Sequence, residues 1–176
     1  MEKLNLMHKD KKAQAWAMDL MVASVIFLIA IVIFYVYALN DPGEARENIE
    51  KMNYDGKIIG DSLLSEGYPK DWYGDDVVAP GILTKNKINE TKLDRFYDLV
   101  NSDYEKTKRL FNTRYEYYFS LNATSGADCI PLDVGAGSVS GIGLDPLSSN
   151  PRNLIKITHF TVYKDRPVTA YIQIWE

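Results

Sequence analysis

Few side chains in this sequence are suited to catalysis or to metal binding. The single cysteine, Cys129, precedes Ile130-Pro131 and has no basic neighbour that would favour a reactive thiolate. The histidines are His8 and His159, and His159 lies in a predicted strand with no Ser, Cys or Asp at a recognisable nucleophile spacing. One cysteine and two histidines are also too few for a cysteine- or histidine-based metal centre. We therefore predict that the chain is not an enzyme and holds no cofactor and no metal.

Two segments have the composition of ligand loops but not the spacing. The glycines of 135–143 suggest a phosphate loop, but the segment lacks a Gly-Lys-Ser/Thr ending and a following helix. Asp71, Asp75 and Asp76 offer oxygens to calcium, yet their spacing matches no calcium motif, and a solvated acidic loop is the simpler interpretation. With 20 Lys+Arg against 24 Asp+Glu, the chain also lacks the basic character expected of a nucleic-acid partner.

Two sequons could accept an N-linked glycan. They are Asn89-Glu90-Thr91 and Asn122-Ala123-Thr124, and both fall in predicted loops. Asn89 has a second interpretation, as the cap of a helix that begins near Thr91.

The apolar residues are concentrated in one run near the N-terminus. The 20 residues from Leu20 to Leu39 carry no charge. As a helix this run is about 30 Å long, which matches the hydrocarbon core of a bilayer. A buried core helix is the alternative, but the run is apolar on every face. Tyr35 and Tyr37 near its end are typical of a membrane interface. We predict one transmembrane helix over 14–40.

The charges beside this run predict its orientation. Lysines precede it at positions 3, 9, 11 and 12, so the leader 1–13 is expected in the cytoplasm and the domain 41–176 outside the cell. A cleaved secretory signal with a site at Val36-Tyr37-Ala38 is the competing interpretation. The apolar run is longer than the core of an ordinary signal peptide, which argues against it.

The junction reads Lys11-Lys12-Ala13-Gln14-Ala15-Trp16-Ala17-Met18-Asp19. It resembles the class III signal sequence of archaeal type IV pilin-like proteins. The resemblance implies that a prepilin-type peptidase removes the leader before Gln14, or before Ala15, and leaves the apolar helix attached. The family has Ser two residues after the glutamine and Glu four residues after it. Here Trp16 replaces the Ser, and Asp19 lies five residues after Gln14, or four after Ala15.

Asp19 lies at the start of the apolar helix and has two interpretations. The resemblance implies that it pairs with the new N-terminal amine of a neighbouring subunit, which would offset the cost of a charge near lipid. Alternatively it lies at the headgroup level, where a negative charge suits the positive end of the helix dipole. Both remain open.

The resemblance implies a structural role at the cell surface. We expect a subunit or minor component of a pilus-like filament, with a task in adhesion. Its partners would be membrane lipid, the peptidase, and further copies or other pilin-like subunits contacted through the N-terminal helix. The alternative is a permanently anchored extracellular binding module, and a third is an anchored hydrolase.

The outer part begins with a predicted amphipathic helix over about 42–66. Asp41 is the expected N-cap and Pro42 the first helical residue. An apolar stripe follows and is expected to lie under a sheet, facing Ile172 and Ile174. A break near Asp55-Gly56 and a coiled-coil dimer seam are the alternatives. The stripe comprises Ala45, Ile49, Met52, Gly56, Ile59 and Leu63.

The rest of the sequence predicts an α+β head with short helices and a small antiparallel sheet. Leu93, Phe96, Tyr97 and Val100 form one helical stripe, and Ser102 with Glu105 forms a capping box for the next helix. Strands are expected at 114–121, around 130–134 within the loop-rich 122–153, and at 154–163 and 168–175, which form a hairpin joined by 164–167. In strand 154–163 the apolar residues change parity, which predicts either a bulge near Thr158-His159 or burial on both faces.

Overall fold

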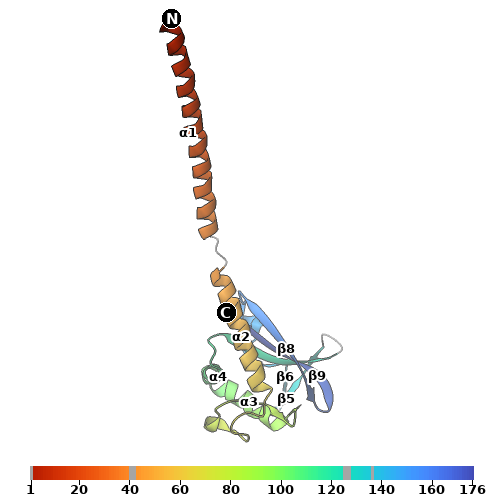
Figure 1. Cartoon of the computed structure of the whole chain (residues 1–176). Helices are drawn as coiled ribbons and strands as arrows, with labels where there is room; N and C mark the ends of the chain where they lie inside the picture. The colour runs from red at the N-terminus through yellow and green to blue at the C-terminus, as the bar shows by residue number, and fades with distance from the viewer. Residues whose placement is uncertain (1, 40–42, 125–127, 136) are drawn as a thin grey trace. The chain divides into compact units, whose positions relative to one another are not determined.

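The computed structural model describes residues 2–39, 43–124, 128–135 and 137–176, with side chains from Trp16 onward except those of 43–45. The chain divides into two compact units, Met1–Arg46 and Glu47–Glu176. The first contains helix α1, Glu2–Leu39 (Figure 1). The predicted apolar helix therefore continues backward through the leader. Asp41 and Pro42, the predicted helix start, lie outside the described residues.

The second unit is built on a mainly antiparallel sheet in the order β4-β3-β9-β8. The strands are β3 Glu116–Ala123, β4 Cys129–Ile130, β8 Leu154–Tyr163 and β9 Arg166–Trp175, and β7 Ile142–Gly143 pairs with β3. On β3, Tyr117, Phe119 and Leu121 are fully buried, and Tyr115, directly before the strand, is buried as well. The α+β class is confirmed.

The β8–β9 hairpin is present, but its turn is shorter than predicted. Lys164 and Asp165 have φ values of 50° and 59°, and they alone connect the strands. Two central residues with positive φ define the type I′ turn that matches the twist of a hairpin. Arg166 and Pro167, predicted as part of the connection, are the first residues of β9.

The predicted bulge in β8 is absent. Pairing with β9 is unbroken from Leu154↔Trp175 to Tyr163↔Arg166. Ile155 and Ile157 therefore lie on one face, and Phe160 lies on the other, where it is 77% exposed. Burial on both faces was the other alternative, and it is also wrong for Phe160. The parity change reflects an apolar residue placed on an open face.

Helix α2, Gly43–Leu63, packs on the Ile157 face of the sheet and runs without a break through Gly56. A Cβ at Gly56 would lie 2.6 Å from Ile157 Cδ1 and 3.0 Å from Ile174 Cγ2. The glycine therefore permits close contact between helix and sheet, and this packing outweighs its poor helix propensity. The expected proximity of the stripe to Ile174 is confirmed.

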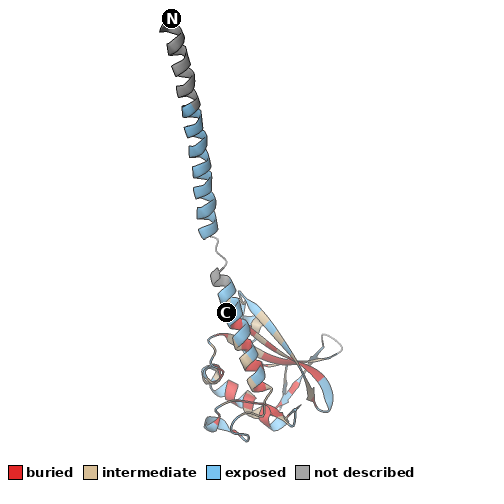
Figure 2. Ribbon diagram, in the orientation of Figure 1, coloured by how far each residue is buried: buried red, intermediate tan, exposed pale blue. Residues whose placement is uncertain are grey.

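The stripe on α2 is buried only in its second part. Met52, Ile59 and Leu63 are fully buried, whereas Ile49 is 44% exposed (Figure 2). The prediction that Ile49 lies under the sheet is therefore wrong, because the sheet does not cover the helix at this position. The side chain of Ala45 lies outside the described residues.

Two further helices lie on the same face of the sheet. They are α3 Glu90–Ser102 and α4 Tyr104–Leu110, and the ring of Phe111 lies 6.3 Å from Phe96 and 5.3 Å from Tyr117. The predicted capping box is wrong. Ser102 is the last residue of α3, and the Asp103 side chain caps α4 by accepting a 2.8 Å hydrogen bond from Lys106 N.

Short elements complete the head. They are the 3₁₀ turn η1 Gly74–Asp76, β1 Leu83–Thr84, β2 Lys87–Ile88, β5 Leu132–Val134, β6 Gly137–Val139 and α5 Pro146–Ser149. The predicted strand around 130–134 is thus divided between β4 and β5. The loop-rich 122–153 contains several short strands, which its Gly and Ser content concealed.

Candidate functional site

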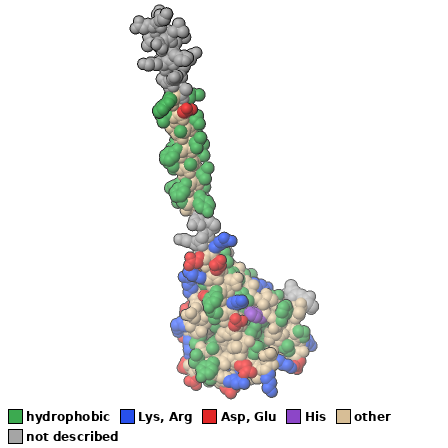
Figure 3. Space-filling model, in the orientation of Figure 1, with side chains coloured by type: hydrophobic (Ala, Val, Ile, Leu, Met, Phe, Trp, Pro, Cys, Tyr) green, Lys and Arg blue, Asp and Glu red, His purple; other side chains and the backbone are tan. Residues whose placement is uncertain are grey.

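The first unit presents an apolar helix with no protein around it. The segment Trp16–Leu39 is 24 residues long, about 36 Å, and is long and apolar enough to cross a membrane. Its large apolar side chains are 46–81% exposed. Figure 3 shows the segment as a nearly continuous apolar column with one acidic side chain near its beginning. The segment begins four residues earlier than the predicted apolar run and therefore includes Asp19.

Asp19 is exposed on this helix, in the first turn of the apolar segment. At 100° per residue, Asp19, Ala23, Ile26 and Ala30 share one face of the helix. The carboxylate and the two small side chains are therefore brought to one side. The processing residues Lys11, Lys12, Ala13, Gln14 and Ala15 lie within α1, but their side chains are outside the described residues.

The two sequons lie in different environments. Asn89 Oδ1 accepts a 3.1 Å hydrogen bond from Lys92 N, and Asn89 Nδ2 donates a 3.2 Å bond to Thr84 Oγ1. Its interpretation as a helix cap is confirmed, and the nitrogen that a glycan would occupy already has a partner. Asn122 lies half-buried in β3, paired with Thr169 on β9 and Cys129 on β4, rather than in a loop.

His159 packs against helix α2. A Cβ at Gly60 would lie 2.7 Å from His159 Nε2, so a glycine is needed where the imidazole meets the helix. This nitrogen and Thr161 Oγ1 are buried and lack hydrogen-bond partners among the described residues. Neither atom is therefore hydrogen-bonded to a candidate nucleophile among the described residues, and the imidazole packs between β8 and Gly60 of α2.

The segments with ligand-loop composition have local roles. Asp75 forms a 2.6 Å ion pair with Lys106, whose hydrogen bond holds the pKa of the Asp75 carboxyl below its ordinary value. Gly135 N donates a 2.9 Å hydrogen bond to Asp94, so a carboxylate already occupies this backbone donor of the glycine segment. Within the described parts of the chain, no group of three or more His, Cys, Asp or Glu could hold a metal ion.

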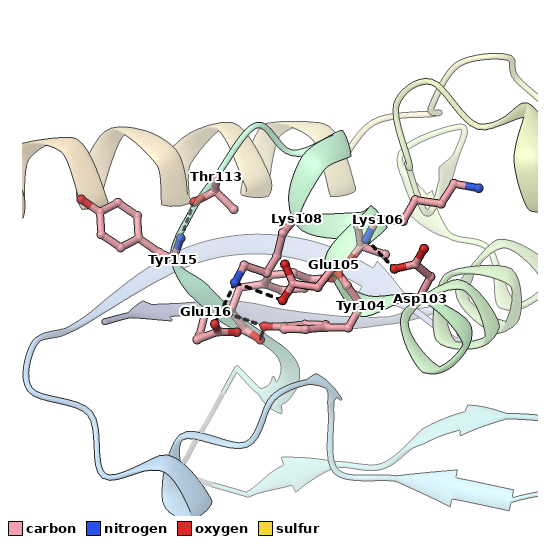
Figure 4. A network of polar contacts seen from close by, with 10 residues as sticks. Asp103, Tyr104, Glu105, Lys106, Lys108, Thr113, Tyr115 and Glu116 are labelled. Carbon is pink, nitrogen blue, oxygen red and sulfur yellow. Dashed lines mark hydrogen bonds and ion pairs between the residues drawn. The ribbon is translucent and has the colours of Figure 1, made fainter.

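A polar network joins α4 to β3 (Figure 4). Lys108 is buried, and its Nζ lies 2.8 Å from Glu116 Oε1 and 3.5 Å from Glu105 Oε1. The Tyr104 hydroxyl accepts a 3.0 Å bond from Tyr117 N and donates a 3.3 Å bond to Tyr117 O. Burial raises the pKa of both tyrosine hydroxyls, so they remain neutral partners within the structure.

A small pocket of about 220 Å³ lies between the loop that contains η1 and helix α3. Its lining includes Tyr73 from the loop and Arg95, Asp98 and Ser102 from α3. The sequence does contain a relevant pattern, because Arg95, Asp98 and Ser102 are spaced i, i+3 and i+7 and share one helix face. The spacing alone does not identify a site, because only the contact with Tyr73, 22 residues earlier than Arg95, makes this face a pocket.

The chain matches no protein-family model, and no curated protein or solved structure is significantly similar to it.

Proposed function

We propose that the chain is a pilin-like structural protein of the cell surface, a subunit or minor component of a type IV pilus-like filament with a task in adhesion. The observation that carries the proposal is the exposure of every described side chain from Trp16 to Leu39. An apolar helix of this length needs cover from outside the chain, and lipid before assembly and neighbouring helices afterwards would both supply it.

The head supports the same proposal because it has a buried core of its own, which runs from Met52 to Trp175 in the part of the chain that the structure describes. A head with its own core suits display by a helix that changes its surroundings from bilayer to bundle. The same property suits the alternative, a permanently anchored binding module, so the head does not discriminate between the two.

The junction supplies the discriminating residues. Removal of the leader before Gln14 or Ala15 by a prepilin-type peptidase would delete the lysines that hold the N-terminus at the cytoplasmic face. Asp19 would then lie close to the new amine and to the small side chains Ala23 and Ala30, which permit close approach of helices. The head would face the outside of the cell.

The test combines N-terminal analysis with assembly. Intact-mass measurement of the protein isolated from its native membrane should show loss of residues 1–13 or 1–14. An Asp19→Ala variant should insert into the membrane but fail to enter filaments, and Asp19→Glu should retain assembly at least in part. Asp61→Ala is the matched control, because it removes an exposed carboxylate from the head and should leave assembly unchanged.

An intact leader together with normal behaviour of Asp19→Ala would overturn the filament proposal. The anchored binding module would then be the better account. Protease added to intact cells tests the orientation separately, since it should remove the head and spare the leader.

A further inference from the structure

We infer that the pocket between Tyr73 and helix α3 binds a neutral saccharide, one sugar unit at a time. This inference is independent of the filament proposal, because the head carries the pocket whether or not the chain assembles.

The pocket has one rigid aromatic wall. Tyr73 is 70% exposed, so its ring adds little to the core of the head. The loop that presents the ring is nevertheless fixed. The adjacent Trp72 is fully buried, with its Nε1 donating a 3.0 Å hydrogen bond to Gly81 O. An exposed ring on a fixed support loses little conformational entropy when a ligand stacks on it.

The opposite wall carries a donor and an acceptor that do not satisfy each other. Arg95 Nη1 donates a 2.9 Å bond to Trp72 O, which fixes the guanidinium 5.6 Å from the centre of the Tyr73 ring. Among the described residues, Arg95 forms no ion pair, although Asp98 lies three residues later on the same helix face. Both residues line the pocket. Within the described parts of the chain, Asp98 has no hydrogen-bond or ion-pair partner, and Arg95 has only the carbonyl of Trp72 and the ring of Tyr73.

This combination selects the chemical class of the ligand. A sugar hydroxyl both accepts and donates, so neighbouring hydroxyls satisfy a guanidinium and a carboxylate together. The charges of Arg95 and Asp98 cancel, which favours a neutral ligand over an anion such as phosphate. The C–H face of a pyranose supplies the apolar surface that stacks on the part of the Tyr73 ring that Arg95 leaves exposed.

The size of the pocket limits the ligand. At about 220 Å³ it is smaller than the roughly 300–1,000 Å³ of sites for drug-sized molecules. A single hexose unit, free or at the end of a glycan chain, matches this volume. An isolated unit of this size is expected to bind with a Kd in roughly the millimolar range.

Saturation-transfer NMR on the full chain tests the inference. The chain is kept in micelles of a detergent without a sugar headgroup, since a maltoside or glucoside would compete for the site. The probes are glucose, galactose and mannose, with glucuronate as the charged comparison. At least one neutral hexose should receive saturation from the wild-type protein, and more strongly than glucuronate does.

Three variants locate the binding. Tyr73→Ala and Asp98→Asn should each reduce the affinity at least about tenfold, as expected for loss of a stacking surface or of a charge-assisted hydrogen bond. Tyr68→Ala is the matched control, because Tyr68 is 68% exposed in the same loop but does not line the pocket. It should bind like the wild type.

The inference is overturned if none of the three hexoses receives saturation. It is also overturned if Tyr73→Ala binds as well as Tyr68→Ala, which would place the binding elsewhere, or if glucuronate binds best. Because Tyr73 and Asp98 are exposed, both variants should fold, and their unchanged melting temperatures confirm that lost binding is local.

Discussion

Replacing Gly56 by alanine tests the close packing of α2 on the sheet. The new Cβ would lie 2.6 Å from Ile157 Cδ1 and 3.0 Å from Ile174 Cγ2, against about 3.5–4.0 Å for an optimal carbon–carbon contact. Overpacking of this kind costs about 1–3 kcal/mol. Alanine gains roughly 0.5–1 kcal/mol over glycine inside a helix. The free energy of unfolding should therefore fall by a net of about 0–2.5 kcal/mol.

A second substitution separates the clash from any other effect. Ile157→Val removes the Cδ1 atom that the new Cβ would meet. The next nearest atom of the Ile157 side chain, Cγ1, lies at an ordinary contact distance of 3.6 Å. Alone, Ile157→Val should lower the free energy of unfolding by about 0.5–1.5 kcal/mol. Combined with Gly56→Ala, it should recover roughly 1 kcal/mol relative to the sum of the single changes. Relief is partial because Ile174 Cγ2 stays in place.

The assay is urea unfolding of the head, residues 43–176, followed by far-UV circular dichroism. Glu50→Ala is the matched control, since Glu50 is exposed on the same helix and its replacement should change stability by less than about 0.5 kcal/mol. A Gly56→Ala variant more stable than the wild type, with no coupling to Ile157→Val, would refute the close approach of helix and sheet.

Three further predictions concern the head. Asp103→Ala should lower the free energy of unfolding by about 1 kcal/mol through loss of the α4 cap, whereas Ser102→Ala should have a smaller effect; urea unfolding of the two variants compares them. Lys92→Met should destabilise the head by about 1–3 kcal/mol in the same assay, because the buried Lys92 ammonium donates to two backbone carbonyls that would lose their donor. The pKa values of Tyr104 and Tyr117 are raised by burial above their ordinary 10.0, so the stability they contribute is fully present below pH 10.0 and is lost as pH rises beyond it. Unfolding measured on both sides of that pH should show a shallower decline for Tyr117→Phe than for the wild type, and equal declines would contradict the argument.

Local patterns in the sequence predicted most elements of the head. Alternation identified β3, the period of the Leu93–Val100 stripe identified α3, and the β8–β9 hairpin followed from two apolar runs with a polar connection. These features depend on residues close together in the chain. They are the part of a fold that composition and spacing specify directly.

The wrong predictions concern positions where the structure depends on a contact with a residue far away in the sequence, or on which of two adjacent residues caps a helix. Ser102 and Asp103 are both good caps and adjacent, and the sequence alone does not rank them. Gly56 has a poor helix propensity, and only the facing Ile157 explains why the helix continues. Phe160 has an apolar side chain on an open face, which no alternation rule anticipates.

The candidate sites differ in the same way. The apolar segment and its acidic residue were evident from the sequence, because an uncharged run of this length has few explanations in a protein. The saccharide pocket was not, because it requires Tyr73 to meet a face of α3 that looks like an ordinary solvated helix surface. Arg95 and Asp98 indicate a binding site only once it is known that they form no ion pair with each other.

Substitutions in the two units should have different effects, because the head has a buried core and the apolar helix is exposed. The buried core of the head runs from Met52 to Trp175, so substitutions there should change melting and unfolding. The side chains of residues 16–39 are exposed, so substitutions there should leave the stability of the head unchanged and act on insertion or association. Asp19→Ala should therefore give a head with an unaltered melting temperature. A change in that temperature would mean that the helix supports the head directly, and any assembly defect of the variant would then need a structural explanation before a functional one.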